Sequence, residues 1–357
     1  MSQNKKLILV IGATGAQGIA VIDALLAPQA DGSPSPYAVR ALTRNPDHRR
    51  AQLLAKKGVQ FARGAVDDFA AVAAALEGAY GVWVNTDGFT LGEQKEIFVG
   101  MRIFEIAKQA PSLRHYVWSN LDYVFKETGY NPTYKCEHCD AKGRVGEWLQ
   151  MQPSDVSDTG LSWSMVTSLP YMEMLNNIMF GPLHRREDGT FVFPTPIGNG
   201  HVPMIALADF GFFARYTFDH RAETSREELK IISDLVSWDY LVSTFTKVTG
   251  QKAVAVYQSA DEWADNFHNT DRPIATERQK GDGSTTWRQN FKGLFALYRD
   301  DVVKRDLEWN RRINPNTRSV ETWMRENNYT GELDFDTLKG TEDGKDHIIN
   351  VERVSQL

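Results

Sequence analysis

The first glycine-rich turn restricts the fold more than any other feature of this chain. An apolar run at residues 7–11 leads into GATGAQG, where Gly12, Gly15 and Gly18 have G-x-x-G-x-x-G spacing, and helical spacing continues from Gln17 to Leu26. Glycines at a strand-to-helix junction permit a tight turn and a close approach of the backbone to a phosphate at the helix N-terminus. An ordinary strand-to-helix turn is the alternative, but the β-α-β context favours dinucleotide binding.

Short apolar runs alternate with helical stretches from this turn to Thr167. The predicted strands are 37–43, 59–63, 80–84, 115–119 and 161–167, and the predicted helices are 47–57, 69–76, 94–109 and 142–151. Strands separated by helices are typical of parallel β-α-β units. We therefore predict an α/β fold with an NAD(P)-binding, Rossmann-like, doubly wound parallel sheet.

The pattern loosens after Pro170, where a Gly- and Pro-rich stretch predicts a hairpin or a long loop at 181–203. The remaining predictions are helices at 206–218, 237–249, 291–298 and 320–327, a strand at 230–233, mostly helical connections elsewhere and a poorly ordered tail from Lys339 onward. We predict a Rossmann domain at 1–169 and a smaller, mostly helical C-terminal lobe for substrate or partner at 170–357. Parts of about 204–250 are expected to return to the Rossmann core.

The composition argues against several classes of protein. The chain has 357 residues, enough to bury a full core. A net charge of −6 argues against a broad basic face for nucleic acid, and no apolar run approaches the length of a membrane span. The apolar start is too short for a signal peptide, and two cysteines fit a reducing compartment. We expect a soluble cytoplasmic protein without direct nucleic-acid binding; a nuclear location and a homodimer are compatible with the sequence.

The end of the second predicted strand bears on cofactor choice. NAD-preferring sites usually place an acid there for the ribose diol, whereas a cation accommodates the 2′-phosphate of NADP. The sequence RALTRNPDHRR has Arg44 at this position, Arg49 and Arg50 on the next predicted helix, and no acid before Asp47. A solvated surface charge is the alternative for Arg44. We predict NADP(H) as the cofactor, with NAD(H) as the second candidate.

Eight stretches along the chain together resemble the NmrA-like family of atypical short-chain dehydrogenase/reductases. They are GATGAQG, TRNP, EGAYGVWVNT, HCDAKGRVGEWL, SLPYMEML, GHVPMIALADFG, FKGLFALYRDD and NPNTRSVETWMREN, in this order. The resemblance runs almost from end to end. It implies a Rossmann fold and NADP(H), and either a reductase or a noncatalytic protein that binds the cofactor as a redox sensor or co-repressor.

The resemblance also implies a set of cofactor-binding residues. These are Gly12, Ala13, Thr14, Gly15, Ala16, Gln17 and Gly18 at the pyrophosphate, Arg44 and Asn45 at the 2′-phosphate end, Ala65 and Val66 at the adenine, Asn85 and Thr86 along the path to the nicotinamide, Lys142 at its ribose, and Pro170, Tyr171, Met172 and Glu173 near the nicotinamide. One position departs from the family pattern. The family often has G-D-x-D-D where this chain reads GAVDD, so Ala65 replaces an acid expected near the adenine and Val66 is left to pack on the base.

The catalytic candidates centre on Lys142. Ordinary short-chain reductases use Tyr-x-x-x-Lys on one helix face, where the lysine lowers the pKa of the tyrosine that donates the proton. Here His138 stands four residues before Lys142. A histidine can donate a proton near neutral pH, but a sensor that had lost catalysis would look the same.

Two hydroxyl side chains complete the catalytic candidates. Tyr134 would lie two turns from Lys142, on roughly the same face, if the residues between them were helical. Ser119 ends the strand YVWSN, where such reductases keep a hydroxyl for the substrate carbonyl. A strand-terminal serine bonded to the backbone is the alternative.

The motif CEHC, with Cys136 and Cys139, suggests a metal site or a redox pair. A structural zinc site needs four ligands, and the sequence has no other cysteine and no H-x-x-x-H, so we predict no metal site. A C-x-x-C near a helix start can lower a thiol pKa. A regulatory thiol pair therefore stays open beside two ordinary, partly buried thiols.

Two functional hypotheses follow. The first is an NADP(H)-dependent reductase of a small, fairly apolar carbonyl, imine or enone substrate. The second is a noncatalytic NADP(H)-binding redox sensor or transcriptional co-regulator with a regulatory protein partner. Glu173 lies in the apolar stretch LPYMEML, so its carboxylate must find a partner or a ligand.

Overall fold

The computed structural model describes residues 5–334, 336, 338 and 349–357, which form two compact units. Unit 1 contains the chain up to Asp122 together with Ala141–Ser168 and Leu207–Ile231. Unit 2 contains Tyr123–Asp140, Leu169–Ala206 and the chain from Ile232 onward. The division into domains at residue 169 stays a prediction. The units interleave along the chain, because 123–140 groups with unit 2 and 207–231 with unit 1.

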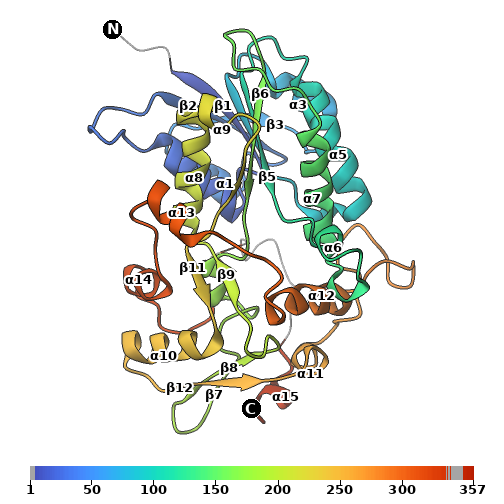
Figure 1. The fold of residues 1–357 in the computed structure, drawn as a ribbon, viewed down its shortest axis with the longest axis vertical. Helices are drawn as coiled ribbons and strands as arrows, with labels where there is room; N and C mark the ends of the chain where they lie inside the picture. The colour runs from blue at the N-terminus through green and yellow to red at the C-terminus, as the bar shows by residue number, and fades with distance from the viewer. Residues whose placement is uncertain (1–4, 335, 337, 339–348) are drawn as a thin grey trace. The chain divides into compact units, whose positions relative to one another are not determined.

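Unit 1 is built on a seven-stranded sheet in which every neighbouring pair of strands is parallel (Figure 1). Its spatial order is β10 (Glu228–Lys230), β6 (Ser162–Thr167), β5 (His115–Asn120), β4 (Gly81–Val84), β1 (Lys6–Ile11), β2 (Tyr37–Thr43) and β3 (Gln60–Arg63). The predicted Rossmann-like fold class is confirmed. The strand order changes direction between β1 and β4, which is where such sheets bind ligands at their carboxyl edge.

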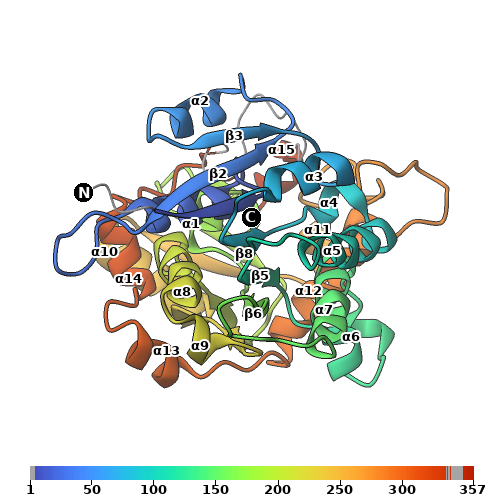
Figure 2. The same ribbon diagram turned by 90° about the horizontal axis from the view of Figure 1, so that it is seen from above.

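Helices cover both faces of this sheet. Figure 2 shows α3 (Phe69–Leu76), α5 (Glu93–Ala107) and α7 (Glu137–Gln150) on one side, and α1 (Ala16–Leu26), α8 (Leu207–Asp219) and α9 (Arg221–Thr224) on the other. Because both faces are covered, β4, β5 and β6 are buried along their whole length. Val84, Trp118 and Met165 pack with Ile103 and Val145 in one apolar cluster. Burying each such side chain stabilises the fold by roughly 1.5–3 kcal/mol.

Unit 2 combines two small sheets with helices. The stretch 181–203 contains the predicted hairpin, with β7 (His184–Arg185) antiparallel to β8 (Phe191–Thr195), and then β9 (Val202–Met204), which pairs with β11 (Asp234–Val236). The largest helices are α10 (Trp238–Thr249), α12 (Trp287–Arg299), α13 (Leu307–Ile313) and α14 (Val320–Glu326). The predicted mostly helical character of the C-terminal region is thus confirmed, with these sheets added.

The helices of unit 2 begin where the sequence places capping residues. Ser237 accepts the Tyr240 N–H at the start of α10, and Gly250 ends that helix at a φ of +73°. Thr286 and Gln289 form a reciprocal capping box at the start of α12. A cap of this kind contributes about 1 kcal/mol to helix stability. Helix ends in this unit are therefore determined locally.

Two predicted elements were wrong in extent, and one strand was not predicted. Helix α7 begins at Glu137 instead of 142, because Glu137 and Asp140 favour a helix N-terminus although they give no apolar periodicity. The strand predicted at 230–233 is β10, which ends at Lys230, one residue before the last residue of this part of unit 1, Ile231. The region after residue 249 also contains β12 (Ala253–Tyr257), which is held by parallel pairing with β8.

The C-terminal tail is described only in part. The prediction of poor order from Lys339 onward falls mainly on residues 339–348, which lie outside the described residues. The final described segment contains the short helix α15 (Val351–Val354). Among the described helices, none has both the length and the apolar character needed to cross a bilayer.

Candidate functional site

The turn after β1 is packed so closely that two of its glycines have no room for a side chain. Gly12 has a φ of +81°, and a Cβ there would lie 2.7 Å from the carbonyl oxygen of Asn85. A Cβ on Gly18 would overlap the backbone of Gly12 and Ala13. These contacts join the end of β1 to the residue after β4 and seat α1 directly on the turn. The sequence pattern therefore reflects real steric limits.

The middle glycine differs from the other two. Apart from the adjacent residues and the backbone of its own helix, a Cβ on Gly15 would have one near neighbour among the described residues, the Gly12 carbonyl oxygen at 3.4 Å. Gly15 is the N-cap of α1, is exposed, and supplies no side-chain cap. Open space beside an uncapped helix N-terminus is what a pyrophosphate requires, so the residues present fit this part of a dinucleotide.

The basic side chains near this turn have different environments. Arg44 and Asn45 are exposed after β2, whereas Arg50, on α2 (Arg49–Ala55), is buried with its Nη1 3.4 Å from the Thr14 carbonyl oxygen. Arg50 was not among the residues predicted for the cofactor site. The run DHRR was the available signal, but only the packing of α2 shows which arginine reaches the turn.

The expected adenine region is partly apolar. Ala65 and Val66 are half-buried, and Val66 packs against the apolar cluster of unit 1. The neighbouring Asp67 forms an ion pair with Lys95 at 2.8 Å. Its hydrogen bond with Lys95, assisted by the charge of Arg44, holds the pKa of Asp67 below its ordinary value. An acid is thus present two positions after Ala65, but it is engaged by Lys95.

Lys142 lies at the centre of a buried polar cluster in unit 1. Its Nζ donates to Asn85 Oδ1 at 3.0 Å, to the Thr86 carbonyl oxygen at 2.9 Å and to Thr86 Oγ1 at 3.1 Å. Glu96 Oε1 is 3.3 Å away and the Trp118 ring centroid 5.1 Å away. Lys142 is 8% exposed and Glu96 is fully buried. Asn85, Thr86 and Lys142, predicted separately, therefore come together after β4.

Glu96 is a residue of this cluster that the sequence analysis missed. It lies on α5, and its Oε1 also accepts a hydrogen bond from Thr86 Oγ1 at 2.6 Å. Without Lys142, its buried charge would have no compensating cation among these contacts. A charged residue on the inward face of a predicted helix could have indicated a buried ion pair. Its partner could not be predicted, because Lys142 lies 46 positions later in the chain.

Ser119 is the strand-end hydroxyl expected to contact substrate. Its Oγ donates to Gln17 Oε1 at 2.8 Å, and both side chains are buried. The end of β5 is thereby tied to the first turn of α1. Ser119 bonds to a side chain and so differs from the backbone-bonded serine considered as the alternative; its role in substrate binding stays a prediction.

His138 and Tyr134 lie in unit 2, each with a polar partner of that unit. Nδ1 of His138 is 3.0 Å from Asn290 Nδ2 on α12. The Tyr134 hydroxyl donates to Asp300 at 2.9 Å, and this bond raises the pKa of the tyrosine. Tyr134 ends a 3-10 helix (Pro132–Tyr134), so no continuous helix joins it to α7. The two-turn spacing that would align Tyr134 with Lys142 is therefore absent, whereas His138 and Lys142 both lie on α7.

The residues expected near the nicotinamide form a bridged segment in unit 2. Ile205 donates its N–H to the Pro170 carbonyl at 3.0 Å, and the Met172 N–H donates to the Ile205 carbonyl at 2.9 Å. Tyr171 is half-buried between them. Glu173 Oε1 accepts a hydrogen bond from the Trp323 indole at 3.0 Å. The carboxylate thus has a protein partner, and contact of this segment with a cofactor stays a prediction.

The comparison with known proteins extends the resemblance seen in the sequence. A model of the NmrA-like family matches residues 4–277. The chain belongs to the NmrA-like family. This NmrA-like chain is 30% identical over 278 residues to hkm9, an NmrA-like family domain-containing oxidoreductase of Aspergillus hancockii, covering 74% of this chain and 78% of the relative. It is also 25% identical over 353 residues to malD, another NmrA-like family domain-containing oxidoreductase, from Malbranchea aurantiaca. This match covers 88% of this chain and 99% of malD.

Solved structures agree on the fold of this NmrA-like protein. NmrA, a negative transcriptional regulator in complex with NAD, superposes with a TM-score of 0.68 at 18% identity, covering 91% of this chain and 95% of NmrA. The NADPH-dependent quinone oxidoreductase QOR2 of Escherichia coli, in complex with NADPH, superposes with a TM-score of 0.65 at 18% identity. The superposition covers 90% of this chain and 100% of QOR2. NmrA has also been solved with NADP. The expected cofactor agrees with the dinucleotides in these neighbours.

Proposed function

We propose that this NmrA-like protein is an NADP(H)-dependent reductase. The observation that carries the proposal is the pairing, within unit 1, of an uncapped glycine turn with the buried Lys142 cluster. Gly12 contacts Asn85, and Asn85 in turn accepts a hydrogen bond from Lys142, so the two halves are linked. The oxidoreductase names of the sequence relatives support the same reading.

Different residues of unit 1 bind different parts of NADP(H). The N–H groups at the start of α1 attract the pyrophosphate, because a helix N-terminus carries partial positive charge. Arg50 and Arg44 supply cations for a 2′-phosphate. Lys142 has three N–H donors, so a ribose hydroxyl can bind by replacing Asn85 or Thr86 as one acceptor. Bound NADPH would supply a hydride to the substrate carbon.

The proposed substrate is a small, fairly apolar carbonyl, imine or enone compound. After hydride addition, the substrate oxygen or nitrogen needs a proton. His138 is the proposed donor, because it lies on the same helix as Lys142 and a histidine exchanges protons near neutral pH. Tyr134 is the weaker candidate, since its hydroxyl donates a hydrogen bond to Asp300, which raises the pKa of the tyrosine. Ser119 would bind substrate by exchanging its bond to Gln17.

A single-turnover experiment tests the reductase. NADPH oxidation is followed by absorbance over a panel of small aromatic and aliphatic carbonyl, imine and enone compounds. The test variant is Glu96→Gln/Lys142→Met, which removes the ammonium without leaving a buried carboxylate unpaired. Lys57→Met is the matched control, because Lys57 pairs with Asp23 at an exposed site. We expect about 100-fold slower turnover in the double variant and none of this loss in the control.

One result would contradict the reductase and favour the second candidate, a cofactor-dependent sensor. The observation behind that candidate is the environment of Tyr134, whose hydrogen bond to Asp300 and raised pKa oppose a role as proton donor. A sensor binds NADPH with the expected dependence on Lys142 but oxidises it with none of the panel. Its regulatory protein partner would then be captured differently by the NADPH-bound and NADP-bound protein.

A further inference from the structure

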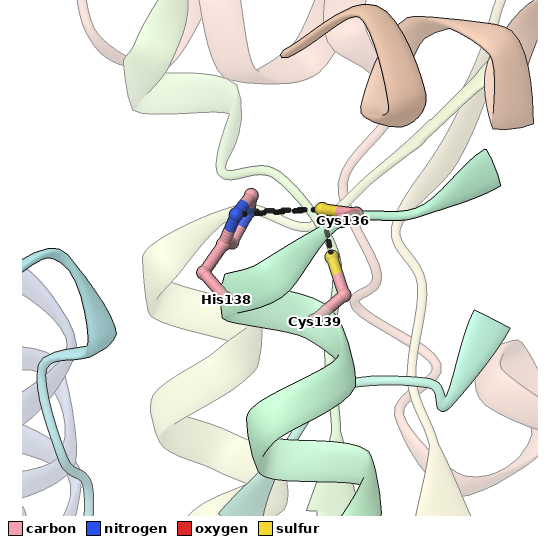
Figure 3. Close-up of side chains that lie close together, drawn as sticks. All are labelled: Cys136, His138 and Cys139. Carbon is pink, nitrogen blue, oxygen red and sulfur yellow. Dashed lines mark hydrogen bonds between the residues drawn. The ribbon is translucent and has the colours of Figure 1, made fainter. Parts of the chain in front are cut away.

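The two cysteines of the chain lie in contact at the start of α7. Figure 3 shows their sulfur atoms facing each other, with the His138 ring beside Cys136. The two Sγ atoms are 2.9 Å apart and both residues are free thiols. Cys136 is fully buried and Cys139 is 7% exposed. Two sulfurs this close need only a small movement to reach the bonded distance of about 2.05 Å.

The surroundings of this pair distinguish its two thiols. The Cys136 sulfur lies 3.4 Å from Nδ1 and 3.7 Å from Nε2 of His138, so the imidazole is in contact with this sulfur. Contact with Cys136 and burial raise the pKa of Cys139 well above its ordinary value. Because His138 contacts the Cys136 sulfur and the pKa of Cys139 is raised, we assign the attack on the oxidant to Cys136 and the second step to Cys139.

The backbone of the first turn holds this arrangement in place. The Cys136 carbonyl oxygen accepts the N–H groups of Cys139 at 3.0 Å and Asp140 at 2.8 Å. The Cys136 N–H donates to Asp140 Oδ2 at 3.1 Å, and Asp140 Oδ1 accepts from the Phe125 N–H at 3.0 Å. The Asp140 carboxylate is thus engaged on both oxygens.

A metal ion is the competing explanation for the same three side chains. Donor atoms of Cys136, His138 and Cys139 all lie within 4.8 Å of one another. A structural zinc site needs a fourth ligand, and in the described part of the chain this group of metal-type donors has three members. Bonding to one zinc would also push the sulfurs apart to about 3.7 Å. The incomplete ligand set favours direct reaction between the sulfurs.

We propose that Cys136 and Cys139 form a reversible intramolecular disulfide with hydrogen peroxide as the oxidant. The Cys136 thiolate attacks one peroxide oxygen, so that an S–O bond forms, the O–O bond breaks and hydroxide leaves. Cys139 then attacks the Cys136 sulfur, so that the S–S bond forms and the second hydroxide leaves. The two thiol protons convert both hydroxides to water. Two thiols lose two electrons and one peroxide becomes two waters; glutathione reverses the change by thiol–disulfide exchange.

Thiol titration measures this reaction directly, because the chain contains only these two cysteines. The full-length reduced protein is treated with hydrogen peroxide, and separately equilibrated overnight across glutathione buffers from reduced to oxidised. We expect both titratable thiols to be lost together, with a mass decrease of two hydrogen atoms and a monomeric band on a non-reducing gel. Dithiothreitol should restore both thiols. This readout needs no NADPH, so it is independent of the proposed reductase activity.

Single substitutions test the order of the two steps. Cys139→Ser should stop at the sulfenic acid on Cys136, which dimedone traps, whereas Cys136→Ser should give much less trapped product. Retention of both thiols in the wild-type protein under every buffer would overturn the proposal, provided that the urea-unfolded protein oxidises. Stoichiometric bound zinc that protects the thiols until a chelator is added would also overturn it. Both decisive outcomes use the wild-type protein and do not depend on a variant folding.

Discussion

Helix α7 carries two polar clusters, and their difference separates two kinds of chemistry. In unit 2 its first turn places His138 beside two thiols, whereas in unit 1 Lys142 is surrounded by hard oxygen acceptors and the carboxylate of Glu96. Thiol sulfur is polarisable and can be oxidised. A buried ammonium and carboxylate are not oxidised in this way, and they are stabilised by each other and by polar ligands. One turn of helix thus separates a candidate redox pair from a candidate cofactor anchor.

The largest expected effect tests whether the Lys142 cluster is held by its charge pair. Lys142→Met should lower the free energy of unfolding by about 3–5 kcal/mol, because Glu96 keeps a buried charge without its cation. Glu96→Gln/Lys142→Met should recover most of this loss. Urea denaturation at neutral pH measures both. Equal destabilisation of the single and double variants would show that charge pairing is unimportant there.

The next prediction distinguishes a glycine that is required for packing from a glycine that is required for cofactor binding in the turn of unit 1. Gly18→Ala should destabilise the protein by about 1–3 kcal/mol, because its Cβ would overlap the backbone of Gly12 and Ala13. Gly15→Ala should change stability much less, since the nearest atom that its added Cβ would meet, apart from the adjacent residues and its own helix backbone, is the Gly12 carbonyl oxygen, at 3.4 Å. Its NADPH affinity should nevertheless fall at least tenfold. Calorimetry for binding and urea denaturation for stability distinguish the pair, and similar NADPH affinity in Gly15→Ala and wild type would contradict the assigned role.

A smaller effect concerns the choice between phosphorylated and unphosphorylated cofactor. Arg50→Met should weaken NADPH binding about tenfold and NADH binding little, because one charge-assisted contact contributes roughly 1.5–3 kcal/mol. Arg44→Met serves as the exposed comparison. Titration with both cofactors gives the ratio of dissociation constants. A parallel loss for NADPH and NADH would mean that Arg50 only supports the turn at Thr14.

The smallest effect concerns His115, a buried histidine of unit 1. His115 is fully buried, with Nδ1 3.1 Å from Ser162 Oγ and Nε2 3.0 Å from Ser164 Oγ, and burial lowers its pKa from 6.5 to about 3. Between these values the unfolded state binds more protons, so stability falls as the pH decreases below about 6.5.

This single group should account for about 0.8 kcal/mol of lost stability near pH 6. The expected difference is a flatter dependence of unfolding free energy on pH in His115→Gln than in the wild type. Chemical denaturation between about pH 5.5 and 7.5 measures it. Identical slopes in the two proteins would show that His115 does not titrate differently in the folded and unfolded states.

The candidate site was predictable where its signals were local. Glycine spacing and apolar runs act within a few positions, and they indicated the Rossmann-like sheet and the turn at Gly12, whereas the role predicted for Lys142 was implied by the resemblance to the NmrA-like family. Local patterns failed where a distant partner decides the outcome. The strand β12 depends on pairing with β8, about 60 positions earlier along the chain, and polar residues at the start of α7 gave no apolar periodicity.

Local sequence patterns were enough to predict the alternating strands and helices of the Rossmann-like sheet, the glycine turn and the residue types available for chemistry. Which of these residues meet depends on the fold, as for Glu96 with Lys142, Arg50 with Thr14, and Glu173 with Trp323. The physical reason is that backbone preferences depend on neighbouring residues, whereas the partner of a buried polar group depends on which strands lie side by side. Parallel β-α-β topology brings together residues that are far apart along the chain.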